Sequence, residues 1–439
     1  MKKVLIIANL FHAFPRIPGI STYLSDFDWQ ATIISPPVDD DSIRRLGFPR
    51  EFKKRVKIIA APYNGDVFWL LRRILCTFKF RKNESIPEQI KESLGITSKK
   101  SLIDSLMRVY QTFFAYPDTE KTWRSSALRA AKKAIQSEKY DLILSSSPFP
   151  TSHIVASQLK KLFGISWVAD FRDPWTQNHN YPFGPIRRFF ERKLEIKTIK
   201  PADAVIAASP AYANKLSHIH HKTISVITNG YDPATENDFS LPLTNKFTIT
   251  YTGNIYTGKQ DPEKFLIALK NLILSNQISS QDVEVRFFGA RQTWLQNMVS
   301  NHGLNGVAQL FGKISREDIL NRQKESQVLL LFNWEDPNEK GVYPLKFFEY
   351  LAAKRPILAT GGHAGDDIEK ICQESGAGNY AASIADIEQT LKRYYDEYRS
   401  TGSVHFAGNA SKVEKYSYRN LAGNLAAVLN QISGRCGIV

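Results

Sequence analysis

The segment Glu339–Pro356, which reads EKGVYPLKFFEYLAAKRP, carries residues whose types and spacing could bind a charged ligand. Pro344 suits the first position of a helix, and Gly341 before it allows close approach of the backbone. The free N–H groups and the positive dipole end of such a helix favour a phosphate. Lys346 lies in the first turn, and the carboxylate of Glu349 on the same side can accept two vicinal hydroxyls, as in a ribose. An exposed Lys–Glu pair on a surface helix is the alternative interpretation.

Other signatures of catalysis are missing from the chain. No G-x-G-x-x-G follows Val4–Ala8, and G-x-x-x-x-G-K-[ST], H-E-x-x-H and G-x-S-x-G do not occur. Asp26 and Asp28 have the spacing of a metal-binding pair but precede a strand, so a surface turn is the better interpretation. The three cysteines are too far apart for a disulfide framework or a Cys-based metal site. We therefore expect no metal, no cofactor and a reducing, cytoplasmic setting.

The elements that must position these residues follow a regular order. Short apolar runs alternate with stretches of helical periodicity, which predicts parallel sheets covered by helices on both faces. The predicted strands are Val4–Ala8, Ala31–Ile34, Lys57–Ala60, Asp141–Leu144, Ser166–Ala169, Ala204–Ala207 and Ile224–Ile227, then Phe247–Tyr251, Val283–Phe288, Val307–Leu310, Val328–Phe332 and Pro356–Ala359. The predicted helices include Ser126–Glu138, Ser152–Phe163, Pro185–Thr198, Pro262–Leu274 and Pro344–Lys354.

The two series of strands are separated by a stretch rich in Pro, Asn, Asp and Thr, which predicts an interdomain linker. The expected fold class is α/β, with two doubly wound, Rossmann-like domains facing each other across a cleft. The expected domains are residues 1–232, a linker at 233–246, a second domain at 247–415, and a C-terminal helix at 416–439 that packs back on the first domain. At 43 % hydrophobic residues, the chain can build cores for both.

Ligands bind beyond the carboxyl ends of the strands in such sheets. Asp170 and Asp173 follow a predicted strand of the first series, and either carboxylate could serve as a base or anchor for a hydroxyl. Arg172 and the next helix could instead hold both carboxylates structurally. His153 is a further catalytic candidate, with packing at a helix start as the alternative. Gly19, expected in the loop after the first strand, either lets the backbone approach a ligand or forms an ordinary turn.

Four segments in order resemble glycosyltransferase family 4, whose members have the GT-B fold. Phe348–Leu358, reading FEYLAAKRPIL, resembles the nucleotide-binding signature of that family. Tyr251–Tyr256 with Lys259 resembles the loop whose basic residue contacts the diphosphate. Phe311–Ile314 resembles the loop beside the nucleobase, and Val168–Trp175 resembles a motif of the acceptor domain in bacterial members.

The resemblance implies a metal-independent, retaining hexosyltransferase that uses a nucleotide-diphosphate sugar, with UDP as the default base. The implied donor-binding residues are Gly19, Gly253, Asn254, Lys259, Gly312, Lys313, Gly341, Val342, Pro344, Leu345, Lys346 and Glu349. Many members have a second Glu eight residues before the ribose Glu. Here that position is Gly341, and Glu339 from a shifted loop or backbone groups could replace it.

The net charge of +15 is unevenly distributed. Residues 1–235 contain 36 Lys and Arg against 21 Asp and Glu, whereas residues 236–439 contain 22 of each. The stretch Val67–Lys82 combines aromatic and basic residues with no acidic ones, which favours an anionic membrane surface. Its predicted membrane contacts are Phe68, Trp69, Arg72, Arg73, Lys79, Arg81 and Lys82. An internal helix and a nucleic-acid patch are the alternatives, but no nucleic-acid-binding motif accompanies the stretch.

These observations lead to one hypothesis and two alternatives. We expect a glycosyltransferase that extends a glycan or lipid-linked acceptor in bacterial surface polysaccharide synthesis, peripheral on the inner face of the plasma membrane. The first alternative is a nucleotide-sugar 2-epimerase, which shares the two-domain fold but needs no lipid acceptor. The second is a non-enzymatic protein that binds a membrane or nucleic acid through its basic half.

Overall fold

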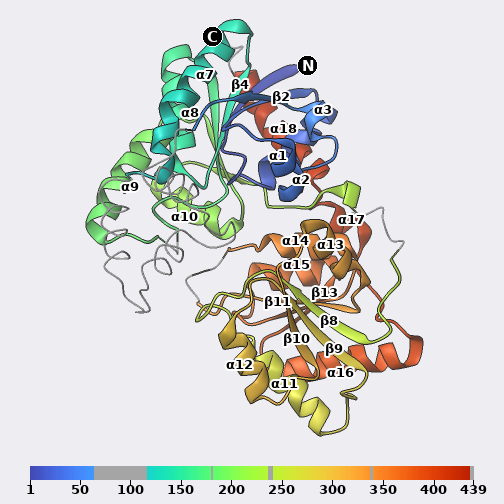
Figure 1. Ribbon diagram of the computed structural model, residues 1–439. Coiled ribbons are helices and arrows are strands. Elements are labelled where there is room, and N and C mark those ends of the chain that lie inside the picture. The colour runs from blue at the N-terminus through green and yellow to red at the C-terminus, as the bar shows by residue number, and fades with distance from the viewer. Residues whose placement is uncertain (64–115, 179–180, 236–240, 337–338, 340, 436–439) are drawn as a thin grey trace, which may run out of the picture.

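The computed structural model describes residues 1–63, 116–178, 181–235, 241–336, 339 and 341–435 of the chain. Two α/β domains lie one above the other in Figure 1, each built around its own parallel sheet. The predicted fold class, two doubly wound domains, is confirmed.

The N-terminal domain contains a seven-stranded sheet in the order β3-β2-β1-β4-β5-β6-β7, with every neighbouring pair parallel. The chain order reverses between β1 and β4, so the loops after these strands diverge. Its strands are β1 (Lys2–Ile7), β2 (Trp29–Ser35), β3 (Lys57–Ala60), β4 (Leu142–Ser146), β5 (Ser166–Phe171), β6 (Ala204–Ala207) and β7 (Ile224–Val226). Its helices are α1 (Arg16–Tyr23), η1 (Leu24–Phe27), α2 (Asp40–Leu46), α3 (Phe52–Arg55), η2 (Thr119–Trp123), α7 (Arg124–Ser137), α8 (Pro150–Phe163), α9 (Pro185–Ile199) and α10 (Pro210–His220).

Both faces of this sheet are buried, as the continuous apolar strands predict. In β1, Val4 and Ile6 enter the core beneath α1, whereas Leu5 and Ile7 enter the core beneath α7 and α8. Successive side chains of a strand point to opposite faces, so a buried strand must be apolar throughout.

The C-terminal domain contains a six-stranded parallel sheet in the order β10-β9-β8-β11-β12-β13. Its strands are β8 (Phe247–Thr252), β9 (Val283–Phe288), β10 (Ala308–Gly312), β11 (Val328–Phe332), β12 (Ile357–Thr360) and β13 (Gly378–Ala381). Its remaining elements are η3 (Pro233–Thr235), α11 (Glu263–Leu274), α12 (Thr293–Asn301), α13 (Arg316–Glu325), α14 (Leu345–Ala353), α15 (Asp367–Ser375), α16 (Ile384–Thr401), α17 (Ala410–Glu414) and α18 (Tyr418–Arg435), of which the first and last flank the domain.

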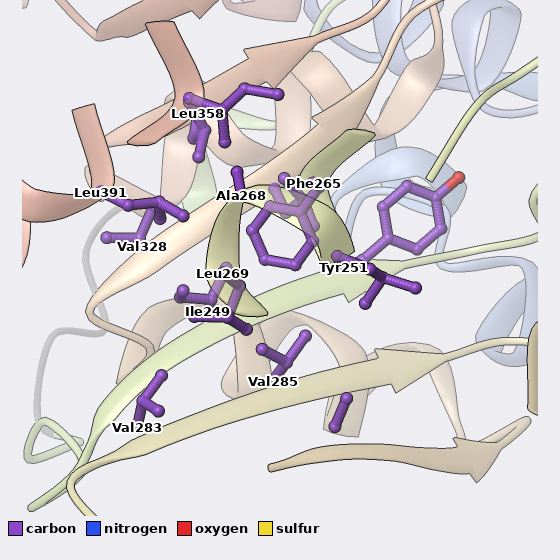
Figure 2. Packing of buried hydrophobic residues seen from close by; sticks show 14 of the residues in the cluster. Ile249, Tyr251, Phe265, Ala268, Leu269, Val283, Val285, Val328, Leu358 and Leu391 are labelled. Carbon is purple, nitrogen blue, oxygen red and sulfur yellow. The ribbon is translucent and has the colours of Figure 1, made fainter. Parts of the chain in front are cut away.

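One core of this domain packs α11, α12 and α16 against β8, β9 and β11. Figure 2 shows part of it, with Tyr251 at one end and its hydroxyl directed away from the aliphatic side chains. The opposite face of the sheet is covered by α14 and α15. The ring of Tyr251 therefore belongs to the core, while its hydroxyl reaches the loops where the strands end.

The chain passes between the domains twice, and the two passages lie side by side. Tyr231 forms an isolated parallel bridge with Ser417, and its N–H donates to the Tyr416 carbonyl over 3.1 Å. After the second passage α18 packs on α1 and η1, and Leu421, Leu425 and Leu429 complete the N-terminal core. In Figure 1 this red helix lies among the blue elements of the N-terminal domain.

The differences from the sequence-based expectations are local. Strand β13 was not predicted, because GNYA lacks the β-branched residues that mark a strand. Pro344 caps α14 instead of occupying its first helical position. Gly19 lies within α1 and not in the predicted loop, and it packs against Tyr418 of α18. No helix in the described ranges is long and apolar enough to cross a bilayer.

Gly19 makes the docking of α18 testable. A Cβ at this position would lie 2.4 Å from the ring of Tyr418, so Gly19→Ala forces the helices apart. We expect this substitution to lower the free energy of unfolding by about 1–3 kcal/mol, the usual range for overpacking. Urea denaturation measures the effect. Gly434→Ala in α18, where no atom lies within 4 Å of the added carbon, is the control and should not destabilise the protein. Equal stability of the two variants would contradict the packing argument.

Candidate active site

A cleft of about 730 Å³ lies between the carboxyl ends of the two sheets. The N-terminal domain lines it with residues from the loops after β5, β6 and β7, and the C-terminal domain lines it with the loops after β8, β9, β10 and β11 and the start of α14. The N-terminal lining is Arg172, Asp173, Asn178, Ala208, Tyr212 and Asn229. This is the position where doubly wound sheets bind ligands.

The start of α14 faces this cleft without a side-chain cap. Pro344 is the N-cap residue and has no side-chain hydrogen bond to offer, so the first helical N–H groups can bind an anion. Gly341 adopts a φ of +88°, and a Cβ there would lie 2.6 Å from Ser209 Oγ and from the Ala211 Cβ. A Glu at this position would collide with the N-terminal domain.

Lys346 holds its amino group deep in the cleft. Its Nζ lies 2.5 Å from the hydroxyl of Tyr251 and 3.9 Å from the centroid of that ring. Burial lowers the pKa of Lys346 to about 7, against the opposing attraction of Glu349. Gly253, with a φ of +105°, leaves room for the amino group, since a Cβ there would lie 2.9 Å from Nζ. An anionic ligand beside Lys346 would favour the protonated amine, so this residue can supply a positive charge to such a ligand.

Glu349 is 8 % exposed and is held by two side chains of α13. Its Oε1 lies 2.7 Å from a guanidinium nitrogen of Arg316, and its Oε2 accepts from Gln323 Nε2 over 3.3 Å. Arg316 also reaches the N-terminal domain, where its guanidinium lies 5.3 Å from the Phe14 ring centroid. No local sequence pattern indicates Arg316, because it lies one helix earlier than the carboxylate with which it pairs.

Lys259 and Glu339 form an ion pair at the edge of the cleft. The Nζ of Lys259 lies 2.6 Å from Glu339 Oε1 and 5.6 Å from the Trp334 ring centroid. Glu339 is 4 % exposed, so its carboxylate is turned to this lysine and not to open solvent. The pair sits on the flank of the cleft formed by the loop before α14.

Most of the predicted donor-binding residues line the cleft, and a few do not. Those that line the cleft are Gly253, Asn254, Lys313, Gly341, Val342, Pro344, Leu345, Lys346 and Glu349. Gly312 is absent from the lining; its carbonyl accepts from the N–H of Gly289 over 3.0 Å and so joins β10 to the end of β9. Lys259 does not line the cleft directly but lies behind Trp334, which does.

The three catalytic candidates of the N-terminal domain have different environments. Asp173 lines the cleft, with its carboxylate 3.7 Å from Arg172 Nε and its backbone N–H donating to Ser147 Oγ over 3.3 Å. Asp170, three residues earlier in β5, is 3 % exposed and accepts two hydrogen bonds from Arg16, at 2.8 and 3.1 Å. Asp170 is therefore a structural carboxylate, and Asp173 is the one that a ligand can reach.

His153 is fully buried beneath the sheet edge, not in the cleft. Ser145 Oγ accepts from Trp167 Nε1 over 2.8 Å and lies 2.8 Å from His153 Nδ1. Burial lowers the pKa of His153 to about 3, so the ring is neutral. The packing alternative fits this residue, because its ring is buried outside the lining of the cleft.

A buried acid beside a histidine was not predicted from the sequence. Glu120 lies on η2 with a 3 % exposed side chain, and its Oε1 is 3.7 Å from Nε2 of the half-exposed His12. Asn9 donates to Oε1, whereas Oε2 has no partner among the described residues. Burial and the nearby Asp118 raise the pKa of Glu120 to about 8. The carboxyl is thus protonated at neutral pH, at the loop where β1 and β4 diverge.

This protonation has a measurable effect on stability. Between about pH 5 and about pH 8 the folded protein keeps a proton on Glu120 that the unfolded chain has lost, so the free energy of unfolding falls as pH rises. Glu120→Gln keeps the acceptor for Asn9 and should reduce this fall, by an amount on the order of 1 kcal/mol or more. Urea denaturation across that pH range measures it.

The control is Glu138→Gln, because hydrogen bonds from Lys3 and Lys57 lower the pKa of Glu138 to about 2 and leave it ionised throughout the range. An unchanged slope in Glu120→Gln would mean that this carboxyl is ionised in the folded protein. A smaller slope of the same sign should persist in the variant, since burial raises the pKa of Asp118 to about 6.

Two further sets of sequence-based expectations concern metals and the membrane. In the described part of the chain, no group of three or more His, Cys, Asp and Glu side chains is arranged so that it could hold a metal ion. Cys372 is a buried free thiol. The predicted membrane contacts between Phe68 and Lys82 lie outside the described residues.

Two doubly wound domains with a cleft between the carboxyl ends of their sheets have the arrangement of the GT-B fold. Residues 99–235 match Glycosyltransferase Family 4, which confirms the resemblance seen in the sequence. A glycosyltransferase of Rickettsia africae superposes with a TM-score of 0.61 at 14 % identity, covering 98 % of both chains. HepE of Anabaena, in complex with UDP and glucose, has a TM-score of 0.59 at 12 % identity and covers 98 % of this chain and 100 % of its own.

Sucrose-phosphate synthase of Thermosynechococcus elongatus is a third such structure, with a TM-score of 0.58 at 12 % identity over 99 % of this chain and 100 % of its own. At these identities the structures establish a shared fold. No curated protein matches the chain.

Proposed function

We propose that the protein is a retaining, metal-independent hexosyltransferase that moves a sugar from a UDP-sugar to a glycan or lipid-linked acceptor in bacterial surface polysaccharide synthesis, on the inner face of the plasma membrane. One observation carries the proposal: the uncapped start of α14, Lys346 and Glu349 all face one interdomain cleft. Anion-binding N–H groups, a cation and a carboxylate are the groups that a diphosphate and a ribose require.

Departure of the nucleoside diphosphate requires that the charge developing on its phosphate oxygens be stabilised. The N–H groups of α14 and the amino group of Lys346 are positioned before the ligand arrives, which is the arrangement that stabilises developing charge most effectively. Lys313 lines the same wall of the cleft. These positive groups support metal independence. Uridine as the base is supported by HepE, whose structure contains UDP.

On the acceptor side Asp173 is the carboxylate within reach of an incoming hydroxyl. It orients that hydroxyl or takes its proton, and Arg172 lies beside it. No protein nucleophile is assigned. With a retained configuration, the acceptor approaches the face of the sugar that the diphosphate leaves, so both substrates share the space between α14 and the loop after β5.

Glu349→Gln tests the nucleotide site. The substitution keeps the size of the side chain but removes the charge that strengthens hydrogen bonds to the ribose hydroxyls, so we expect UDP to bind at least about 10-fold more weakly. Isothermal titration calorimetry measures the affinity. The matched control is Glu325→Gln on α13, whose carboxylate pairs with Arg286 and Arg322 away from the cleft. Unchanged affinity in Glu349→Gln, with both variants folded, would refute the ribose assignment.

Lys346 links nucleotide binding to a proton. Since burial lowers its pKa to about 7, much of the amine is neutral at about pH 8, and a diphosphate beside it favours the charged form. We expect UDP binding at this pH to take up protons, and its affinity to fall as pH rises above about 7. Calorimetry in buffers of different ionisation enthalpy measures the uptake. Lys346→Met should abolish most of it; uptake that persists in this variant would show that another group titrates.

A further inference from the structure

Helix α9 exposes apolar side chains to solvent along its outer face. Ile186 is 76 % exposed, and Phe189 and Phe190 are 55 % and 56 % exposed. Ile196 is also exposed. Their spacing along the helix places them on one side. Such an apolar stripe is ordinarily buried against another element, so its exposure requires an explanation.

All exposed charges of α9 are positive. They belong to Arg188, Arg192, Lys193 and Lys197, and Lys200 follows at the C-cap. The two acidic residues of the helix point inward: Glu191 is 1 % exposed, and Glu195 is completely buried. The outer face therefore combines aromatic and aliphatic groups with cations alone.

The inward acids have partners that fix the rotation of the helix. Glu191 pairs with Arg187 at 2.5 Å and accepts from Trp175 Nε1 over 3.0 Å. Glu195 accepts from Thr176 Oγ1 over 2.5 Å. Rotating α9 to hide its phenylalanines would break these buried contacts, so the apolar stripe stays outside.

The side of α9 opposite this stripe packs on α8, at the outer side of the N-terminal domain (Figure 1). The ammonium of Lys193 lies 4.3 Å from the Phe189 ring centroid, so an aromatic ring and a cation are presented together. The last two residues of α8, Leu162 and Phe163, are also exposed.

We infer that the outer face of α9 binds an anionic lipid surface, with Phe189, Phe190 and Ile186 inserted among the headgroups. Interfacial helices combine an apolar stripe with cations that attract anionic headgroups. A second copy of this chain fits poorly, because a two-fold contact would set this cationic face against itself. The inference deepens the proposed function by naming the surface that presents the acceptor, but lipid binding is measured without any sugar transfer.

Vesicle flotation tests the inference on the full chain. Wild-type protein should float with vesicles of equimolar phosphatidylcholine and phosphatidylglycerol and remain unbound with phosphatidylcholine alone. Two variants separate the contributions: Phe189→Ser with Phe190→Ser removes the apolar groups, and Arg192→Gln with Lys193→Gln and Lys197→Gln removes three charges. Each membrane-facing cation strengthens binding about fivefold, and the two inserted phenylalanine side chains add buried apolar area. Each variant should therefore bind at least about 10-fold more weakly than the wild type.

The matched control carries Leu274→Ser and Lys370→Gln, two exposed positions of the C-terminal domain, and should float like the wild type. Flotation of both α9 variants at the wild-type level would overturn the inference, as would absent or charge-independent binding of the wild type. DNA binding in a gel-shift assay distinguishes a nucleic-acid surface. If the charge variant still binds vesicles but loses a salt-dependent DNA shift that the wild type shows, the face binds nucleic acid instead.

A thermal shift with UDP on the same samples keeps the two proposals distinguishable, since a ligand that binds only the folded state raises its apparent stability. Both α9 variants should retain the shift of the wild type. Absence of that shift in a wild-type protein that floats would refute the nucleotide site and leave the membrane face intact.

Discussion

The buried ion pair between Arg16 and Asp170 fixes the wall of the cleft that the N-terminal domain supplies. The side chains are 2 % and 4 % exposed, so each charge depends on the other for its stabilisation. Ser146 Oγ also donates to Asp170 over 2.8 Å, and Arg16 donates to the Thr228 carbonyl over 2.5 Å. The pair thus joins β4, β5 and α1 to the segment that leads into the other domain. The position of Asp173, three residues beyond Asp170, follows from this anchor.

Three charged residues in or beside the cleft have partners within the protein before any ligand enters. Glu349 is engaged by Arg316, Lys259 by Glu339, and Lys346 by the Tyr251 hydroxyl and ring. A ligand that binds these groups must therefore replace their present partners. Since Arg316 also contacts Phe14, exchange at Glu349 would be felt at the contact between the domains.

Sequence reasoning located the parts of the site whose residues are close in the chain. Lys346 and Glu349 share one helix, so periodicity alone places them together, and the strand runs predicted both sheets because buried parallel strands are continuously apolar. It failed where the partner is distant. Asp170 looked available because Arg16 lies 154 positions away, and His153 looked catalytic because nothing local reveals that Trp167 and Ser145 enclose it. Arg316 was missed for the same reason.

The packing of α18 on α1 also bears on how the chain is made. Leu421, Leu425 and Leu429 occupy the same core as Val4 and Ile6, so one face of β1 is not fully covered until α18 has been synthesised. During translation the C-terminal domain, whose strands lie between residues 247 and 381, has all its sheet residues before the N-terminal core can close. A ribosome-bound chain would therefore expose the N-terminal sheet longest, and this is the surface on which a chaperone would act.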